Sequence, residues 1–126
     1  MKPVVYDSGV LIAADRNERR IWAEHRVRLE AGIVPMVPAP VVAQASRSPK
    51  QVQLRRLLRG CEVVPFDEGA AHASGRLLAK TRTSDVADAS VAELSSRHGA
   101  DVVSGDVADI RSLLAASRVK VKILGV

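Results

Sequence analysis

Short apolar runs alternate with longer segments in which apolar residues recur at helical spacing. The apolar runs predict strands at residues 3–6, 33–37, 61–65, 100–104 and 119–124. The longer segments predict helices, many of them bounded by Pro, Gly or Asp, at 9–14, 17–31, 40–46, 49–59, 68–80, 85–98 and 107–117. Strands that alternate with helices are typical of a parallel sheet covered by helices on both faces.

Two prolines bound the second expected strand. Pro35 and Pro38 lack the N–H that a sheet ladder uses, and proline is therefore rare in central strands. This pattern predicts that the strand at 33–37 lies towards an edge of the sheet.

Acidic residues follow two of the apolar runs. The strand at 3–6 runs into Asp7, the strand at 100–104 is followed by Asp106, and Asp88 lies at the start of the helical segment between them. Because ligands of parallel sheets bind outside the carboxyl ends of the strands, these carboxylates are expected at one edge. Carboxylates brought together from distant parts of the chain suggest a divalent-metal site.

Helix capping is the simpler explanation for some of these acids. The tetrapeptide Asp-Val-Ala-Asp occurs at 85–88 and again at 106–109, each time at a helix start. Free N–H groups and the helix dipole favour acids there by about 0.3–1 kcal/mol each. Capping accounts less well for Asp88 and Asp106 than for the other two acids. It also leaves unexplained why helix starts rich in acids follow so closely on buried strands.

Asp7 has the same two interpretations. It is a good cap for the next helix, although Ser8 could cap it equally well. Two carboxylates about 4 Å apart repel by roughly 4 kcal/mol at an effective dielectric constant of 20. Several converging acids therefore require protonation or a shared cation. Oxygen ligands without a Cys or His cluster favour Mg²⁺ or Mn²⁺ over Zn²⁺.

Composition narrows the classes of function. The chain has 126 residues, with 19 Lys and Arg against 14 Asp and Glu, a formal net charge of +5 that favours polyanionic partners. It has only one Tyr, one Trp and one Phe, which argues against a stacking platform for bases. Cys61 is alone, so no intrachain disulfide is possible. The histidines have no ligand spacing and are expected at the surface or at helix ends: His25, His72 and His98.

No apolar run approaches the roughly 20 residues that span a bilayer, and the N-terminal pattern is not that of a signal peptide. We therefore expect a cytoplasmic protein without a membrane partner. Four arginines are candidates for contact with an RNA backbone, although they could equally form an ordinary solvated face: Arg47, Arg55, Arg56 and Arg59.

Taken in order, these motifs resemble the PIN domain family. The matching segments are Val-Val-Tyr-Asp7-Ser, then Asp85-Val-Ala-Asp88-Ala-Ser, then Val-Val-Ser104-Gly-Asp106-Val-Ala-Asp109. The similarity covers essentially the whole chain and is greatest to the VapC-type ribonuclease toxins of bacterial toxin–antitoxin pairs.

The resemblance implies a fold and an activity. It implies a PIN-like nuclease domain over residues 1–126, built as a three-layer α/β/α sandwich with a central parallel sheet. It also implies RNA cleavage that depends on Mg²⁺ or Mn²⁺, a cognate antitoxin and a homodimer. The catalytic, metal-binding acids would be Asp7, Asp88 and Asp106. Supporting positions would be Ser8, Gln44, Asp85, Ser104 and Asp109.

One position departs from the family pattern and keeps a second hypothesis open. Where such domains commonly carry a Glu after the second strand, this chain has Gln44, which offers a neutral oxygen and no charge. A PIN-like module that binds RNA or protein without cleavage is the alternative. A third possibility, a phosphoacceptor receiver using Asp67, is disfavoured because the first strand ends in a single acid.

Overall fold

The structure is a computed structural model that describes residues 2–126. Its strands are β1 (Val4–Tyr6), β2 (Met36–Pro38), β3 (Glu62–Val64), β4 (Asp101–Ser104) and β5 (Ile123–Gly125). Its helices are α1 (Ser8–Asp15), α2 (Arg19–Glu30), α3 (Ala39–Ala45), α4 (Val52–Arg59), α5 (Glu68–Thr81), α6 (Val86–His98) and α7 (Val107–Ser117).

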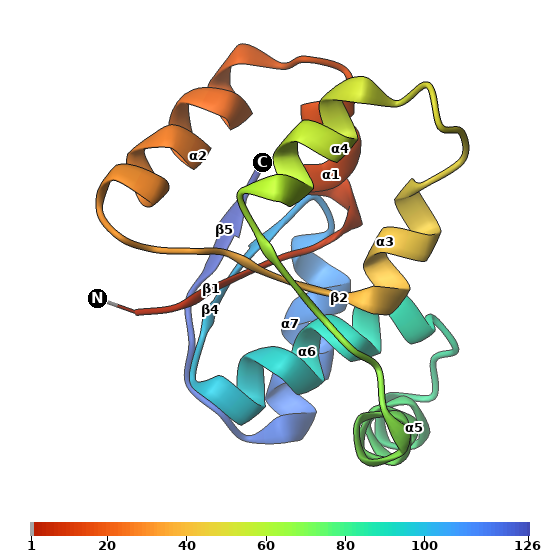
Figure 1. Cartoon of the computed structure of the whole chain (residues 1–126). Coiled ribbons are helices and arrows are strands. Elements are labelled where there is room, and N and C mark those ends of the chain that lie inside the picture. Colours follow the sequence, from red (N-terminus) through yellow and green to blue (C-terminus); the bar gives the residue numbers. More distant parts are fainter. Residues whose placement is uncertain (1) are drawn as a thin grey trace.

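The strands form one parallel sheet in the order β3-β2-β1-β4-β5. Helices α1, α2 and α4 lie on one side of this sheet, and α6 and α7 lie on the other (Figure 1). Helix α5 packs on α6 and α7, and α3 contacts α1 and α6. The predicted α/β fold, a three-layer sandwich around a parallel sheet, is confirmed.

The predicted place of β2 towards an edge is wrong. β2 lies between β3 and β1, and the edges are β3 and β5. Pro35 precedes the strand and its carbonyl accepts the N–H of Glu62 at 2.9 Å, while Pro38 is the last residue of the strand. Since a proline lacks only its N–H, prolines at the two ends leave the ladder between them intact. The strand also starts at Met36, later than the pattern predicts.

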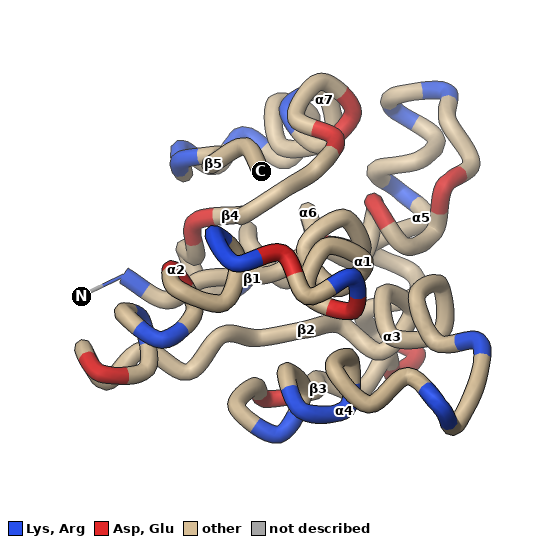
Figure 2. Tube along the Cα trace, turned by 90° about the horizontal axis from the view of Figure 1, so that it is seen from above, with Lys and Arg blue, Asp and Glu red and all other residues tan. Residues whose placement is uncertain are grey.

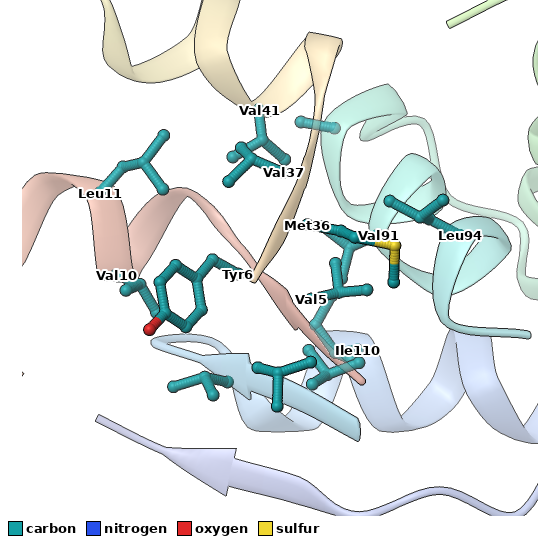
Figure 3. Close-up of a cluster of buried hydrophobic side chains, with 14 of the residues drawn as sticks. Val5, Tyr6, Val10, Leu11, Met36, Val37, Val41, Val91, Leu94 and Ile110 are labelled. Atoms are coloured by element: carbon teal, nitrogen blue, oxygen red, sulfur yellow. The ribbon is translucent and has the colours of Figure 1, made fainter. Parts of the chain in front are cut away.

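The core fills both faces of the sheet. Val5 and Tyr6 of β1, Val37 of β2 and Val102 of β4 are fully buried, and side chains from several helices surround them (Figure 3). Helix α6 is the most enclosed, since every residue from 87 to 95 is buried. Many of these residues are Ala or Ser, whose small side chains let neighbouring elements approach closely. Asp88, in this segment, is therefore largely shielded from water.

Within residues 2–126, none of the helices has the length and apolar character needed to cross a membrane.

Replacing Leu94 tests the importance of α6 to the core. Leu94 is 1% exposed, so Leu94→Ala should lower the free energy of unfolding by about 2–5 kcal/mol, because the cavity it leaves cannot fully collapse. Val27→Ala is the control, since Val27 is 64% exposed and should change stability by less than about 0.5 kcal/mol. Urea unfolding followed by circular dichroism measures both. Equal losses in the two variants would contradict this packing.

Candidate metal centre

The register between β1 and β4 places Asp7 beside the β4–α7 connection. Tyr6 pairs with Val103, and the N–H of Asp7 donates to the Val103 carbonyl at 3.1 Å. The next residues, Ser104 and Gly105, therefore lie against the Asp7 side chain. Asp7 and Ser104 are 97 positions apart in the sequence, and their side chains form a hydrogen bond.

The Asp7 carboxylate is buried and held by donors from two sides. Its Oδ2 accepts the Ser104 hydroxyl at 2.5 Å and the Gly105 N–H at 3.1 Å. Its Oδ1 accepts the Val10 N–H at 3.3 Å, so Asp7 is also the N-cap of α1. Burial raises the pKa of Asp7, and the hydrogen bonds from Ser104, Gly105 and Val10 oppose that rise. These donors fix the orientation of the carboxylate.

Ser104 connects two of the acids. Its hydroxyl donates to Asp7 and accepts the N–H of Asp106 at 2.8 Å. The backbone that presents the Asp106 side chain is thereby tied to the Asp7 carboxylate.

The two Asp-Val-Ala-Asp segments behave differently in the structure. Asp85 caps α6, since its Oδ1 accepts the Asp88 N–H at 2.9 Å. Asp106 occupies the N-cap position of α7 but makes no capping hydrogen bond, and its side chain is exposed. Capping therefore explains Asp85 and does not explain Asp106.

Three carboxylates converge at this edge. Oxygen atoms of Asp88, Asp106 and Asp109 all lie within 4.8 Å of one another. Asp88 is only 8% exposed, and no donor within residues 2–126 reaches its carboxylate. Burial, followed by the charges of Asp85, Asp106, Asp7 and Asp109, raises the pKa of Asp88 to about 7. A hydrogen bond with Asp106 and the charge of that residue raise the pKa of Asp109.

These donors fit a hard divalent cation. The three ligand atoms are all carboxylate oxygens, the set that Mg²⁺ and Mn²⁺ accept. A cation among them would replace the mutual repulsion of Asp88, Asp106 and Asp109 by attraction. Asp7 is not part of this three-residue group in the described chain, although its charge acts on Asp88.

The model of the PIN domain family matches residues 4–112. This chain belongs to the PIN domain family. The resemblance inferred from its motifs is thereby confirmed. Among curated proteins, none is significantly similar in sequence to this PIN domain.

Solved structures agree with the family in fold. The structure of VapBC2 from Rickettsia felis bound to a DNA fragment from their promoter is 13% identical over 98% of each chain, with a TM-score of 0.70. FitAcB from Neisseria gonorrhoeae is 19% identical over 97% of this chain and 96% of that one, with a TM-score of 0.63. PAE2754 from Pyrobaculum aerophilum is 17% identical over 96% and 90%, with a TM-score of 0.62. At such identities the likeness establishes the fold alone.

Two other predicted site residues of this PIN domain lie outside the acid group. Ser8 is half-buried in the first turn of α1. Gln44 is exposed near the end of α3, and its side chain makes no hydrogen bond within residues 2–126. Asp67, considered for a receiver, caps α5 by accepting the Ala70 N–H at 2.8 Å and is not in the acid group.

The candidate RNA-binding arginines form no single cluster of free cations. Arg47 donates to the carbonyls of Ala43 and Ser46, and Arg55 donates to the Pro49 carbonyl. Both therefore brace the connection between α3 and α4. Arg56 lies 4.7 Å above the ring of Trp22, and Arg59 is exposed. Figure 2 shows the basic segments along α4.

The expectation that His25 lies at the surface or at a helix end is wrong. His25 lies within α2 and is 4% exposed, four residues after the buried Ile21. That helical spacing from an apolar residue was the available signal. The hydroxyl of Tyr6 accepts from Arg28 at 3.1 Å and contacts the Nδ1 of His25 at 2.9 Å. The Tyr6 hydroxyl can donate to Nδ1 while it accepts from Arg28, so this contact pairs the buried ring of His25 with Tyr6.

His25 is one of the residues that line a groove between α2 and α4. The groove has a volume of about 460 Å³. Apolar parts of Trp22 and Leu29 form part of its wall, with Arg19, Arg26 and Arg56 around them and Glu30 as the acid. Burial and the charge of Arg28 lower the pKa of His25, which keeps the ring neutral.

Asp88→Asn should stabilise the metal-free protein above about pH 7. The folded-state pKa of Asp88 lies above its unfolded value near 4, so wild type loses stability as pH rises between these values. The variant removes that loss. A rise of about three pKa units corresponds to about 4 kcal/mol, and solvent screening of the carboxyl lowers this to roughly 2 kcal/mol at about pH 8, while little changes at about pH 4. Thermal unfolding at both pH values measures this, with the exposed Glu62→Gln as control.

Mg²⁺ or Mn²⁺ should raise the Tm of wild type at about pH 8 more than that of Asp88→Asn. Lower stability of the variant at high pH would contradict the proposed repulsion.

Gly9→Ala should disturb the backbone next to the Asp7 carboxylate. A Cβ at Gly9 would lie 2.8 Å from the Cα of Gly105, a backbone atom that cannot yield without moving the β4–α7 connection. We expect a loss of about 1–3 kcal/mol in unfolding free energy and weaker stabilisation by Mn²⁺. Gly75→Ala is the matched control, because nothing lies within 4 Å of its Cβ and a helical Ala should stabilise slightly. If the two variants unfold and respond to Mn²⁺ alike, this close approach does not support the site.

Proposed function

We propose that residues 1–126 form one PIN-like nuclease domain that cleaves RNA with Mg²⁺ or Mn²⁺, and that it is a cytoplasmic VapC-type toxin of a toxin–antitoxin pair. The observation that carries this proposal is the convergence of Asp88, Asp106 and Asp109 around a buried carboxylate without a donor. A protein gains nothing in stability from such a group, and a hard cation is the chemistry that makes it useful.

Asp88, Asp106 and Asp109 would hold the cation, with Asp7 completing the acidic wall directly or through water. A bound divalent metal supplies a water of lowered pKa and neutralises charge that develops on the phosphate. The chain itself keeps the acids in register, since Ser104 orients Asp7 and positions the backbone of Asp106. Asp85 holds the start of α6, which carries Asp88, by capping it.

The charge balance supports a polyanionic substrate. An acidic centre in a chain of net charge +5 suits the backbone of RNA, which the excess of Lys and Arg would attract. Among the candidate arginines, Arg59 has the most accessible setting, since Arg47 and Arg55 bind carbonyls and Arg56 stacks on Trp22.

Cleavage of structured RNA tests the activity. Wild type should cut only with Mg²⁺ or Mn²⁺, and EDTA should abolish cutting. Asp88→Asn and Asp106→Asn should lower the rate at least about 100-fold, beyond the loss typical of an outer hydrogen-bond partner. The exposed Glu62→Gln controls for charge removal elsewhere. Identical product patterns from wild type and both Asp variants would defeat the nuclease proposal.

The second candidate is a PIN-like module that binds RNA or protein without cutting. Gln44 favours it, because this residue brings no charge where related domains commonly carry an acid. RNA that is retained by wild type and stays intact with both metals would support this alternative.

We also propose a cognate antitoxin and a homodimer. The likeness in fold to VapBC2 and to FitAB, the latter solved bound to an IR36 DNA fragment, supports the antitoxin. The α2–α4 groove is suited to an acidic segment of that partner, because arginines outnumber acids in its lining. Sedimentation of the purified chain tests the homodimer.

Arg56→Glu should weaken the antitoxin complex at least about tenfold, because it reverses a charge in the groove. Arg59→Glu, on the same helix but outside the groove lining, is the control. Calorimetry with the co-encoded small protein measures both affinities. Equal effects of the two substitutions would place the antitoxin elsewhere.

A further inference from the structure

The segment of residues 107–126 is strongly basic. It contains four Lys and Arg and a single acid, Asp109, so it supplies +3 of the formal net charge of +5. It forms α7, the turn that follows and β5, which lies at an edge of the sheet. Figure 2 shows basic segments on α7 and beside β5. Much of the attraction of this chain for a polyanion therefore arises on this part of its surface.

The four cations are available to a ligand. All are exposed, and within residues 2–126 their side chains make neither an ion pair nor a hydrogen bond: Arg111, Arg118, Lys120 and Lys122. The neighbouring acid of β4, Asp101, pairs with Lys2 at 3.2 Å and accepts the backbone N–H of Lys122 at 2.9 Å. Arg47 and Arg55 differ from these cations, because both donate to backbone carbonyls.

Helix α7 leads from the metal centre to these cations. Asp106 is at its N-cap and Asp109 is in its first turn, and both belong to the three-carboxylate group. Arg111 follows Asp109 by two residues, and Arg118 at the C-cap follows Arg111 by seven. Seven residues are about two turns, so the two arginines lie on the same side of α7, about 10 Å apart along its axis. A strand that advances about 3.4 Å per nucleotide covers this distance in about three nucleotides.

The surface between α7 and β5 suits a sugar–phosphate backbone better than it suits bases. A groove of about 250 Å³ lies here, and Arg111 is its one charged lining residue. The rest of its lining is aliphatic: Leu114, Ala115, Val119, Val121 and Ile123. Residues 107–126 include no aromatic side chain on which a base could stack. Contact by charge alone carries no base sequence information.

We propose that the α7–β5 surface, defined by Arg111, Arg118, Lys120 and Lys122, binds the phosphate backbone of the RNA strand next to the cleaved bond without reading its bases. This proposal rests on the proposed ribonuclease function and names where its substrate lies. RNA suits the surface better than an acidic protein segment does, because the surface begins at the metal centre that the phosphodiester must reach.

RNA binding in EDTA tests the proposal without cleavage. Fluorescence anisotropy should show that fluorescein-labelled oligo(A) and oligo(U) of about 12 nucleotides bind wild type within about threefold of each other. Raising KCl from about 50 to 200 mM should weaken both. Arg111→Gln and Arg118→Gln should each weaken both RNAs several-fold and lower the slope of log affinity against log salt by about 0.7.

Two further comparisons separate a phosphate contact from a change in net charge. Arg111→Lys, which keeps the charge, should keep the salt slope of wild type. Lys122→Gln should lower that slope, whereas Lys50→Gln should not, because Lys50 is an exposed lysine in the connection between α3 and α4.

The proposal would be overturned by salt slopes unchanged in Arg111→Gln and Arg118→Gln, by equal effects of Lys50→Gln and Lys122→Gln, or by a base preference beyond about threefold. Absence of RNA binding would also overturn it. Tighter binding of poly-L-glutamate than of RNA would assign the surface to an acidic protein instead. RNA that is cut equally well by wild type and these variants would leave the nuclease proposal standing without this surface. RNA that stays intact with Mg²⁺ or Mn²⁺ but binds through Arg111 and Arg118 would support the surface and refute the cleavage alone.

Discussion

The main physical constraint on the proposed site is the repulsion among carboxylates that lie together at one edge of the sheet. Asp88 belongs to a buried stretch of α6, yet Asp106 and Asp109 lie within 4.8 Å of it. The raised pKa values of Asp88 and Asp109 express that conflict. We propose that the cluster serves binding rather than stability, because a divalent cation would turn the same geometry into attraction.

The topology creates this constraint and supports it. β1 lies at the centre of the sheet, and its pairing with β4 joins Asp7 to Ser104 across the sequence. The backbones at Gly9 and Gly105 lie too close together for a side chain at either position, and Gly9 lies beside the Asp7 carboxylate. Asp7 thus has its hydrogen bonds satisfied by the protein, whereas Asp88 does not. We infer that the hydrogen bonds to Asp7 hold its carboxylate in place beside the other acids.

The sequence predicts the fold class, the helices and the edge at which the acids meet, because hydrophobic periodicity and strand ends are local signals. It cannot separate two identical Asp-Val-Ala-Asp segments. Asp85 caps its helix, whereas the N–H of Asp106 binds Ser104, a contact set by sheet register. The inner place of β2 depends on a proline carbonyl that pairs with β3. The spacing of His25 from Ile21 indicates the buried side of α2, but its partner Tyr6 comes from another element. Tertiary contacts of this kind leave no mark in the local pattern. The catalytic and metal-binding roles of Asp7, Asp88 and Asp106 stay predictions, as do the supporting roles of Ser8, Gln44, Asp85, Ser104 and Asp109.

The most direct test of the central claim is a crystal structure of the chain grown with Mn²⁺ and measured at the manganese absorption edge. An anomalous peak within bonding distance of the carboxylates of Asp88 and Asp106, with Asp109 or Asp7 completing the shell, is the result this account predicts. A map with no peak at this edge of the sheet, while the acids still crowd together without a cation, would contradict it.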